Sequence, residues 1–240
     1  MVYPMKVSFL ATRIQADVMR EREQLESTYD RYPEMTQFWA SVDLVSSSNY
    51  RLEKGPRHGY VRGETFFALI AAVIAPCPEI RLLKEMGDAV LLSAQTFRPL
   101  LECLILIDQT ARQLSRVLTT EHYPFAVRSA IDFGPAKRLI RRHEDFLGIP
   151  LDRLSRLMRV RHDDSSIVLH EDLISFSGDI LQEYRSFLTL GSPQTLSSEL
   201  TKGMSKLVQY RHLFIDRDAL AEFDGFFVQW KGTPGQPATI

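Results

Sequence analysis

Two isolated aspartates, Asp43 and Asp88, stand at the ends of strand-like segments 45 residues apart. Asp43 ends the apolar run 38–42, and Asp88 follows Gly87 in a turn between segments 80–83 and 89–92, with Lys84 just before it. Carboxylates at adjacent strand ends can hold hard divalent cations such as Mg²⁺ or Mn²⁺. Such ions suit phosphate chemistry. Each aspartate taken alone is better interpreted as a turn or capping residue, so the pair needs support from the rest of the chain.

Hydrophobic spacing predicts the elements that must position these carboxylates. The pattern predicts helices over 7–29, 64–74, 98–117, 148–160, 177–187 and 196–208, and a Gly- and Pro-rich loop over 51–63. Strands are expected over 38–44, 80–83, 89–92, 125–133, 167–169, 211–215 and 226–230. Because strict βαβ alternation is rare in this order, we expect an α+β fold with helices covering an antiparallel or mixed sheet.

Composition excludes several classes of protein. With 45% hydrophobic and 25% charged residues, the 240-residue chain is typical of a globular protein, and its net charge of -1 gives no case for nucleic acid or an anionic membrane as partner. The basic cluster 137–143 is followed by two acids and is interpreted as a solvated face. No apolar run suits a membrane span and no secretory signal is evident. Cys77 and Cys103 lack metal-ligand spacing, so we expect reduced thiols and a cytoplasmic protein.

Four segments, in order, resemble the class III nucleotidyl cyclases over roughly residues 35–240. They are 41–48 (SVDLVSSS), 84–88 (KEMGD), 145–157 (DFLGIPLDRLSRL) and 228–232 (VQWKG). Each is a weak match alone, but four in the right order form a much stronger signal. The resemblance implies a ferredoxin-like core for a catalytic domain over 35–240, with residues 1–34 as an N-terminal helical extension.

The resemblance also assigns a metal site. Asp43, Asp88 and the backbone carbonyl of Leu44 would bind two divalent cations, Mg²⁺ or Mn²⁺. Ser47 and Ser48 would face phosphate, where backbone amides at a helix start can bind anions.

The resemblance further implies a nucleoside triphosphate substrate and a homodimer with shared active sites, in which Asp43 and Asp88 come from one subunit and Asp152 and Arg156 from the other. Arg156 would stabilise charge on the α-phosphoryl group and Lys231 would hold the terminal phosphates. Asp152 stands where the family has an asparagine, and an ionised carboxylate cannot donate a hydrogen bond. An inactive cyclase-like binding or dimerisation module is therefore an alternative to an active enzyme.

Base selection is left open by the motifs. Lys84 and Asp145 match the family positions that read adenine, which favours ATP and an adenylate cyclase. The chain as a whole is more similar to the pyrimidine cyclases of bacterial Pycsar anti-phage systems, which favours UTP ahead of CTP. Tyr50 would then fill the volume that a smaller base leaves vacant, and Arg98 is a further possible contact to base or phosphate.

Overall fold

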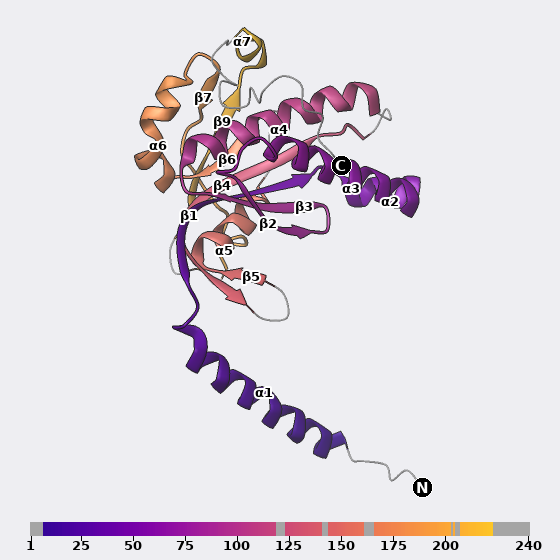
Figure 1. Ribbon diagram of the computed structural model, residues 1–240, viewed down its shortest axis with the longest axis vertical. Coiled ribbons are helices and arrows are strands. Elements are labelled where there is room, and N and C mark those ends of the chain that lie inside the picture. Colours follow the sequence, from indigo (N-terminus) through magenta and orange to yellow (C-terminus); the bar gives the residue numbers. More distant parts are fainter. Residues whose placement is uncertain are drawn as a thin grey trace.

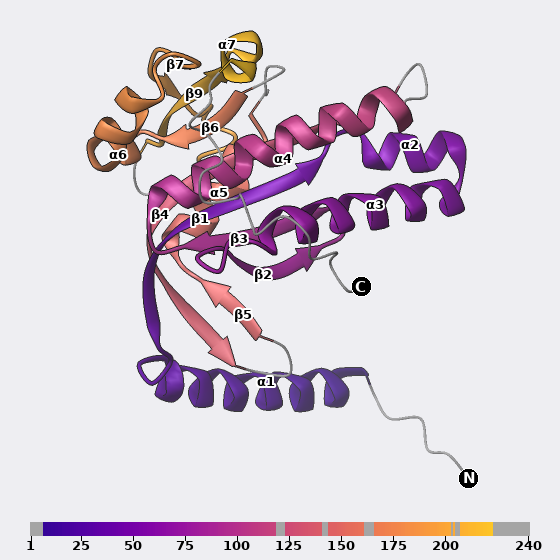
Figure 2. The ribbon, with the colours of Figure 1, turned by 45° about the horizontal axis from the view of Figure 1, so that its top comes forward.

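The computed structural model describes residues 7–118, 123–140, 144–160, 166–202, 204 and 207–222. Within these ranges one mixed sheet of nine strands is covered by helices, which confirms the predicted α+β class. The N-terminal helix α1 (Val7–Tyr29) has the predicted bounds and extends away from the sheet in both ribbon views (Figures 1 and 2).

The sheet has the strand order β2-β3-β1-β4-β6-β9-β7, with β5 paired to β4 and β8 paired to β9. The β4–β6 pair is parallel and every other pair is antiparallel. The strands are β1 Glu34–Leu44, β2 Arg81–Met86, β3 Ala89–Ala94, β4 Val127–Ile140, β5 Glu144–Leu147, β6 Ser166–His170, β7 Leu188–Leu190, β8 Gln194–Thr195 and β9 Gln209–Ile215.

Helices lie on both faces of the sheet. Helices α3 (Pro56–Ile74) and α4 (Phe97–Leu118) run across one face, and α5 (Ile149–Leu157) packs on the other (Figure 2). The remaining helices are α2 Ser47–Lys54, α6 Asp172–Glu183 and α7 Arg217–Ala221. None of the helices in the described part of the chain is long and apolar enough to cross a bilayer.

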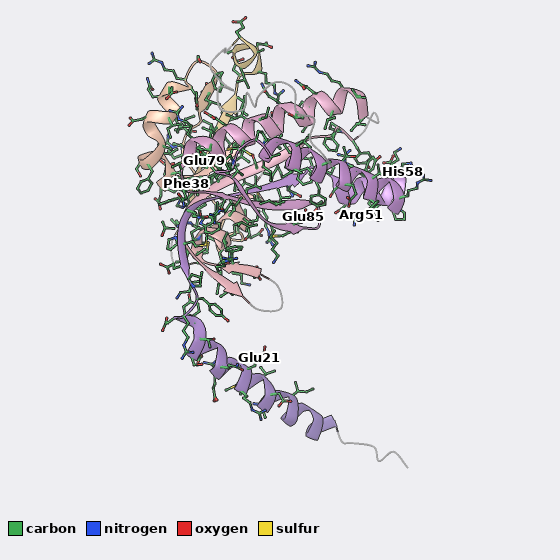
Figure 3. The ribbon with its side chains drawn as sticks, in the orientation of Figure 1. Glu21, Phe38, Arg51, His58, Glu79 and Glu85 are labelled. Atoms are coloured by element: carbon green, nitrogen blue, oxygen red, sulfur yellow. The ribbon has the colours of Figure 1, made fainter. Side chains whose placement is uncertain are left out.

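Successive side chains of β1 point to opposite faces of the sheet, into two separate hydrophobic clusters. Phe38 and Val42 point into the larger cluster with α3 and α4, whereas Trp39 points into the smaller cluster with Leu154 and Leu157 of α5. Successive side chains of a strand alternate between faces, so Asp43 lies on the α5 side with Trp39. The side chain of Phe38 can be found inside the body in Figure 3, whereas Glu21 projects from α1.

The predicted loop over 51–63 is wrong, because these residues lie in the two helices α2 and α3. Gly55, with a φ of 88°, joins the helices, and Pro56 occupies the first turn of α3. Proline is tolerated at this position because the amide it lacks would have no partner there. The Gly- and Pro-rich composition marked the boundary between two helices.

Other boundaries differ from the expectations as well. Strand β4 continues past the predicted end at 133 to Ile140 and pairs with the unpredicted β5. Helix α6 begins five residues before the predicted start at 177, at Asp172. The described residues of 196–208 form turns and not the predicted helix, and the predicted strand 226–230 lies outside the described residues.

Candidate active site

Asp43 and Asp88 are brought together by the pairing of β1 with β3. Asp43 lies opposite Ala89, and the amide of Leu44 donates to the backbone carbonyl of Asp88 at 3.0 Å. Burial is the largest cause of the raised pKa of Asp43, and the negative charge of Asp88 adds to that rise. The structure therefore places the two aspartates at one end of the sheet, as the motif spacing predicts.

Asp43 is also paired with Arg128, its neighbour across β1 and β4. The Arg128 Nε donates to Asp43 Oδ2 at 2.7 Å, and a second guanidinium nitrogen contacts the same oxygen. Burial raises the pKa of the Asp43 carboxyl, and Arg128 offsets part of that rise. Both Arg128 contacts involve the same carboxylate oxygen, Oδ2.

The turn after Asp43 leads directly into a helix. Ser46 has a φ of 58°, a left-handed conformation that non-glycine residues rarely adopt, and α2 begins at Ser47. Ser47 is buried and Ser48 is exposed. The first amides of a helix lack intrahelical partners and suit an anion. The predicted phosphate role of these serines thus falls on a helix N-terminus beside Asp43.

The β2–β3 turn depends on Gly87. Its φ of 69° falls in the left-handed region, which glycine adopts without steric cost. This turn places Asp88 at the start of β3, beside the end of β1.

Lys84 and Asp145 form an ion pair, with 3.0 Å between the Lys84 Nζ and an Asp145 carboxylate oxygen. They lie on β2 and β5, which are not neighbours in the sheet. Their side chains are 40% and 54% exposed, so the pair is open to solvent and to a ligand. The predicted base-reading residues are thereby brought together across 61 residues of chain.

Asp152 and Arg156 lie one turn apart on α5. Both line a cavity of about 520 Å³, together with residues of β6, α6 and the segment before β9. The Arg156 guanidinium donates to the carbonyl of Leu200. No hydrogen bond or ion pair between the described residues joins Asp152 or Arg156 to Asp43 or Asp88.

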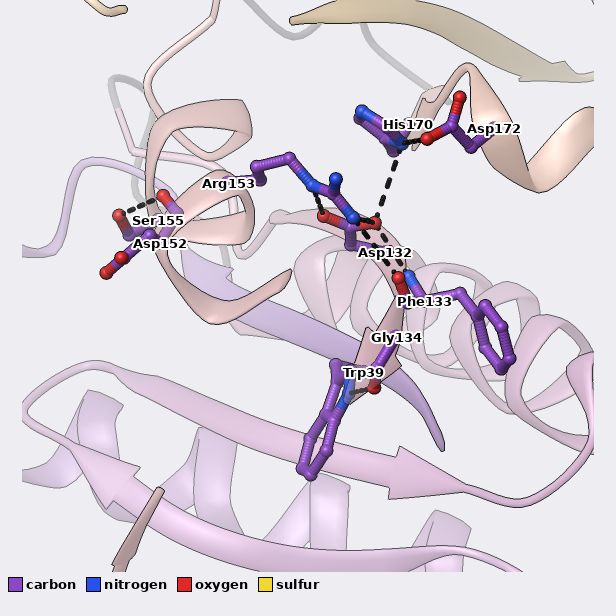
Figure 4. A network of polar contacts seen from close by, with 9 residues as sticks. All are labelled: Trp39, Asp132, Phe133, Gly134, Asp152, Arg153, Ser155, His170 and Asp172. Atoms are coloured by element: carbon purple, nitrogen blue, oxygen red, sulfur yellow. Dashed lines mark hydrogen bonds and ion pairs between the residues drawn. The ribbon is translucent and has the colours of Figure 1, made fainter. Parts of the chain in front are cut away.

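A buried ionic network fixes α5 on the sheet (Figure 4). Arg153 donates to both oxygens of the fully buried Asp132 at 2.7 and 2.9 Å, and to the carbonyl of Phe133. His170 Nδ1 lies 3.6 Å from Asp132 and 3.6 Å from Asp172. Burial raises the pKa of Asp132, an effect that Arg153 partly offsets, and lowers the pKa of His170.

The start of α5 requires a residue without a side chain. A Cβ on Gly148 would lie 2.6 Å from the carbonyl oxygen of Pro135 and 2.9 Å from the Cα of Ala136. Backbone cannot move aside as a flexible side chain can, so only glycine lets α5 approach β4 this closely.

The partners Arg128, Asp132 and His170 were missed by the sequence reasoning. Arg128 lies beside Asp43 because of the β1–β4 register, and His170 ends a strand parallel to the one carrying Asp132. Alternation of polar residues along β4 was the available signal, but it does not specify a partner strand.

Two other residues of the predicted site have partners within the chain. The ring of Tyr50 lies 5.6 Å from that of Tyr123 and against the guanidinium of Arg62. Arg98 donates to Glu183 and Tyr184 within the chain. Lys231 lies outside the described residues.

Comparison with solved structures identifies this architecture. The adenylyl cyclase CyaB from P. aeruginosa superposes with a TM-score of 0.60 at 13% identity, covering 75% of this chain and 95% of that one. The chain has the class III nucleotidyl cyclase fold. A Silicibacter pomeroyi protein described as an adenylate/guanylate cyclase/hydrolase superposes with a TM-score of 0.59 at 17% identity, covering 77% of this chain and 99% of that one. The guanylyl cyclase Cya2 superposes with a TM-score of 0.60 at 12% identity, covering 76% of this chain and 93% of that one.

No family model and no curated protein matches the sequence. The cyclase fold is thus recognised through its three-dimensional arrangement, at identities that carry no information on substrate.

Proposed function

We propose that this protein is a nucleotidyl cyclase that converts UTP to 3′,5′-cyclic UMP and pyrophosphate. The ribose 3′-oxygen would attack the α-phosphorus, the bond to the β-phosphate oxygen would break, and the 3′-hydroxyl proton would leave. The supporting observation is the pairing of Asp43 and Asp88 at one end of the sheet, beside the N-terminus of α2, in a cyclase fold.

The residues at this end fit two divalent cations. Asp43, Asp88 and the Leu44 carbonyl offer oxygen ligands of the kind that Mg²⁺ and Mn²⁺ prefer. Within the described ranges no cluster of three or more His, Cys, Asp or Glu side chains forms a cage, so triphosphate oxygens would complete the coordination. When bound, the cations would neutralise phosphate charge and favour ionisation of the 3′-hydroxyl.

The remaining chemistry is positioning and charge stabilisation. The amides at the start of α2, with Ser47 and Ser48, would hold phosphate. Arg156 would stabilise negative charge on the α-phosphoryl group, after giving up its Leu200 carbonyl. Asp152 can position groups only as a hydrogen-bond acceptor while ionised. Lys231, a predicted nucleotide-binding residue, would bind the terminal phosphates.

The Lys84–Asp145 pair supplies one donor and one acceptor for a base edge. Uracil offers a carbonyl and an N–H on that edge, whereas cytosine and adenine offer an amino group and a ring nitrogen. One lysine and one carboxylate can satisfy either arrangement, so this pair accommodates UTP as well as ATP. The preference for UTP comes from the likeness of the whole chain to pyrimidine cyclases.

We further propose a cytoplasmic homodimer in which residues 35–240 form the catalytic domain. Asp43 and Asp88 of one subunit would face Lys84, Asp145, Asp152 and Arg156 of the other. In support, Asp152 and Arg156 have no hydrogen bond or ion pair to Asp43 or Asp88 among the described residues. A role in anti-phage signalling follows from the same likeness to Pycsar cyclases.

The test is a product assay with the full chain. Purified protein is incubated separately with ATP, GTP, CTP and UTP plus Mn²⁺, and the products are identified by mass spectrometry. We expect cyclic UMP to dominate. Cyclic AMP as the main product would show an adenylate cyclase and refute the base assignment. Folded protein that yields no cyclic nucleotide would favour the inactive module, which the aspartate at position 152 makes a specific alternative.

A further inference from the structure

Arg62 of α3 is a buried arginine that has no carboxylate partner among the described residues. It is 8% exposed, and its Nε atom is buried without a hydrogen-bond partner. An arginine side chain stays protonated in proteins. Burying such a charge without a counter-ion is unfavourable, so a reason for its position is needed.

The guanidinium connects the two segments that lead out of β1 and into β4. It donates to the carbonyls of Val45 at 3.2 Å, Pro124 at 2.8 Å and Tyr123 at 3.3 Å. The amide of Val45 in turn donates to the carbonyl of Ala126 at 2.9 Å. Both the amide and the carbonyl of Val45 are therefore hydrogen-bonded.

Aromatic rings enclose the same guanidinium. Its carbon atom lies 4.7 Å from the ring centroid of Tyr50 and 5.4 Å from that of Phe125. Tyr50 belongs to the first turn of α2, and its amide donates to the carbonyl of Ser46. Arg62 thus contacts the residue before Ser46 and the helix after it.

These contacts surround the turn that the proposed function assigns to phosphate. Val45 precedes Ser46, whose left-handed conformation directs the chain into α2. Fixing Val45 and Tyr50 fixes the direction of the first amides of α2. A positive charge behind those amides adds to the partial charge of a helix N-terminus.

We propose that Arg62 is a positioning residue that holds the 45–50 turn in its phosphate-binding geometry and whose charge, which has no carboxylate partner in the part of the chain that the structure describes, favours a polyphosphate there. This inference rests on the proposed function for the location of the phosphates. It assigns Arg62 to binding of the phosphate chain and not to the transition state.

Two substitutions separate the roles of Arg62. Arg62→Met removes the charge and all three hydrogen bonds, whereas Arg62→Lys keeps the charge but cannot bridge three carbonyls. Arg112→Met is the matched control, because Arg112 is a partly buried arginine of α4 that is paired with Asp108. Unfolding by urea, measured for each variant, reports on folding.

Binding of pyrophosphate in the presence of Mn²⁺ is measured by calorimetry, with uridine as a phosphate-free probe. We expect Arg62→Met to lower pyrophosphate affinity about tenfold, the scale of one lost charge-assisted interaction. Arg62→Lys should lower pyrophosphate affinity about threefold, because it keeps the charge but cannot bridge the three carbonyls. Uridine binding and the Arg112→Met variant should be unchanged. In turnover assays KM should rise by the same factors while kcat changes little.

Folded Arg62→Met with wild-type pyrophosphate affinity would overturn the inference. If that variant does not fold, Arg62→Lys decides, since wild-type affinity in it excludes the positioning role. Equal losses for uridine and pyrophosphate would show a merely structural residue. Because the binding measurement needs no turnover, a wild-type protein that binds pyrophosphate but makes no cyclic nucleotide refutes only the proposed function.

Discussion

Asp43 combines opposing electrostatic effects in one side chain. Burial and the charge of Asp88 raise its pKa, whereas Arg128 favours the ionised form. A cation bound by both aspartates would relieve the repulsion between them. This relief is a physical reason for the proposed site to bind a divalent ion.

Replacing Asp43 with Asn should abolish cyclase activity without unfolding the protein. The change removes the charge but keeps the shape, and we expect turnover to fall by at least about 100-fold, as for loss of a metal ligand. Cyclic nucleotide production with Mn²⁺ and circular dichroism check the two parts. Asp179→Asn, an exposed position in α6, is the control. Substantial residual activity in Asp43→Asn would contradict the metal assignment.

His170 lies among charges of both signs. Asp132, Asp172 and Glu171 favour its protonated form, whereas burial, the largest effect, and Arg153 oppose it. The net result is a pKa below the ordinary value of 6.5. As pH falls below about 6.5, the unfolded chain binds a proton at this position before the folded protein does, which lowers stability.

His170→Gln should therefore reduce the loss of stability on acidification. Between pH 7.5 and pH 5.5 the free energy of unfolding should fall less in the variant than in the wild type. Urea unfolding at several pH values measures the difference. His58→Gln, at an exposed position in α3, should behave like the wild type. If the free energy of unfolding of His170→Gln changed with pH as steeply as that of the wild type, His170 would not titrate as described.

Helix α5 is the element whose placement matters most for the proposed site. Asp152 and Arg156 reach the cavity only because Arg153 is bound by Asp132 and Gly148 lies against β4. Packing, and not the intrinsic helix preference of nine residues, holds so short a helix in place.

The substitution Gly148→Ala tests the close packing of α5 against β4. The added methyl group would meet backbone atoms under 3 Å away, so we expect destabilisation of about 1–3 kcal/mol by overpacking. Gly178→Ala in α6 is the matched control, since no atom lies within 4 Å of its Cβ position. There the better helix former should raise stability by about 0.5–1 kcal/mol. Urea unfolding measures both changes, and an unchanged Gly148→Ala variant would contradict the close packing.

At the scale of the whole molecule, the predicted site residues form two groups. Asp43 and Asp88 lie with the start of α2 at the adjoining ends of β1 and β3, whereas Asp152 and Arg156 of α5 line the cavity. A homodimer with two sites across its interface would join each group to its complement from the partner.

Mixing two inactive variants tests this assembly. Asp43→Asn and Arg156→Ala each disable both sites of a homodimer, but a mixed dimer retains one intact site. Random exchange makes half of the dimers mixed, so activity should return to about a quarter of the wild-type value. Cyclic nucleotide production after co-refolding measures it. No recovery, with mixed dimers present by mass spectrometry, would place both groups in the same subunit.

Sequence alone determined the class of fold and the residues of the proposed site. The periodicity of hydrophobic residues predicted α1 and most of the strands, and the order of the four motifs indicated Asp43, Asp88 and Asp152. These signals are local, since they depend on neighbours within a few residues. The Gly and Pro residues of 51–63 led to the wrong prediction of a loop, because glycine and proline occur both in loops and at helix ends.

The tertiary structure alone decided which distant side chains meet. Strand register placed Arg128 beside Asp43, a parallel pairing brought His170 to Asp132, and the packing of α3 put Arg62 behind the turn at Val45. Register and packing depend on the whole buried surface, which no local pattern specifies. Sequence could therefore propose which residues bear the chemistry, but it could not identify the distant side chains that contact them in the fold.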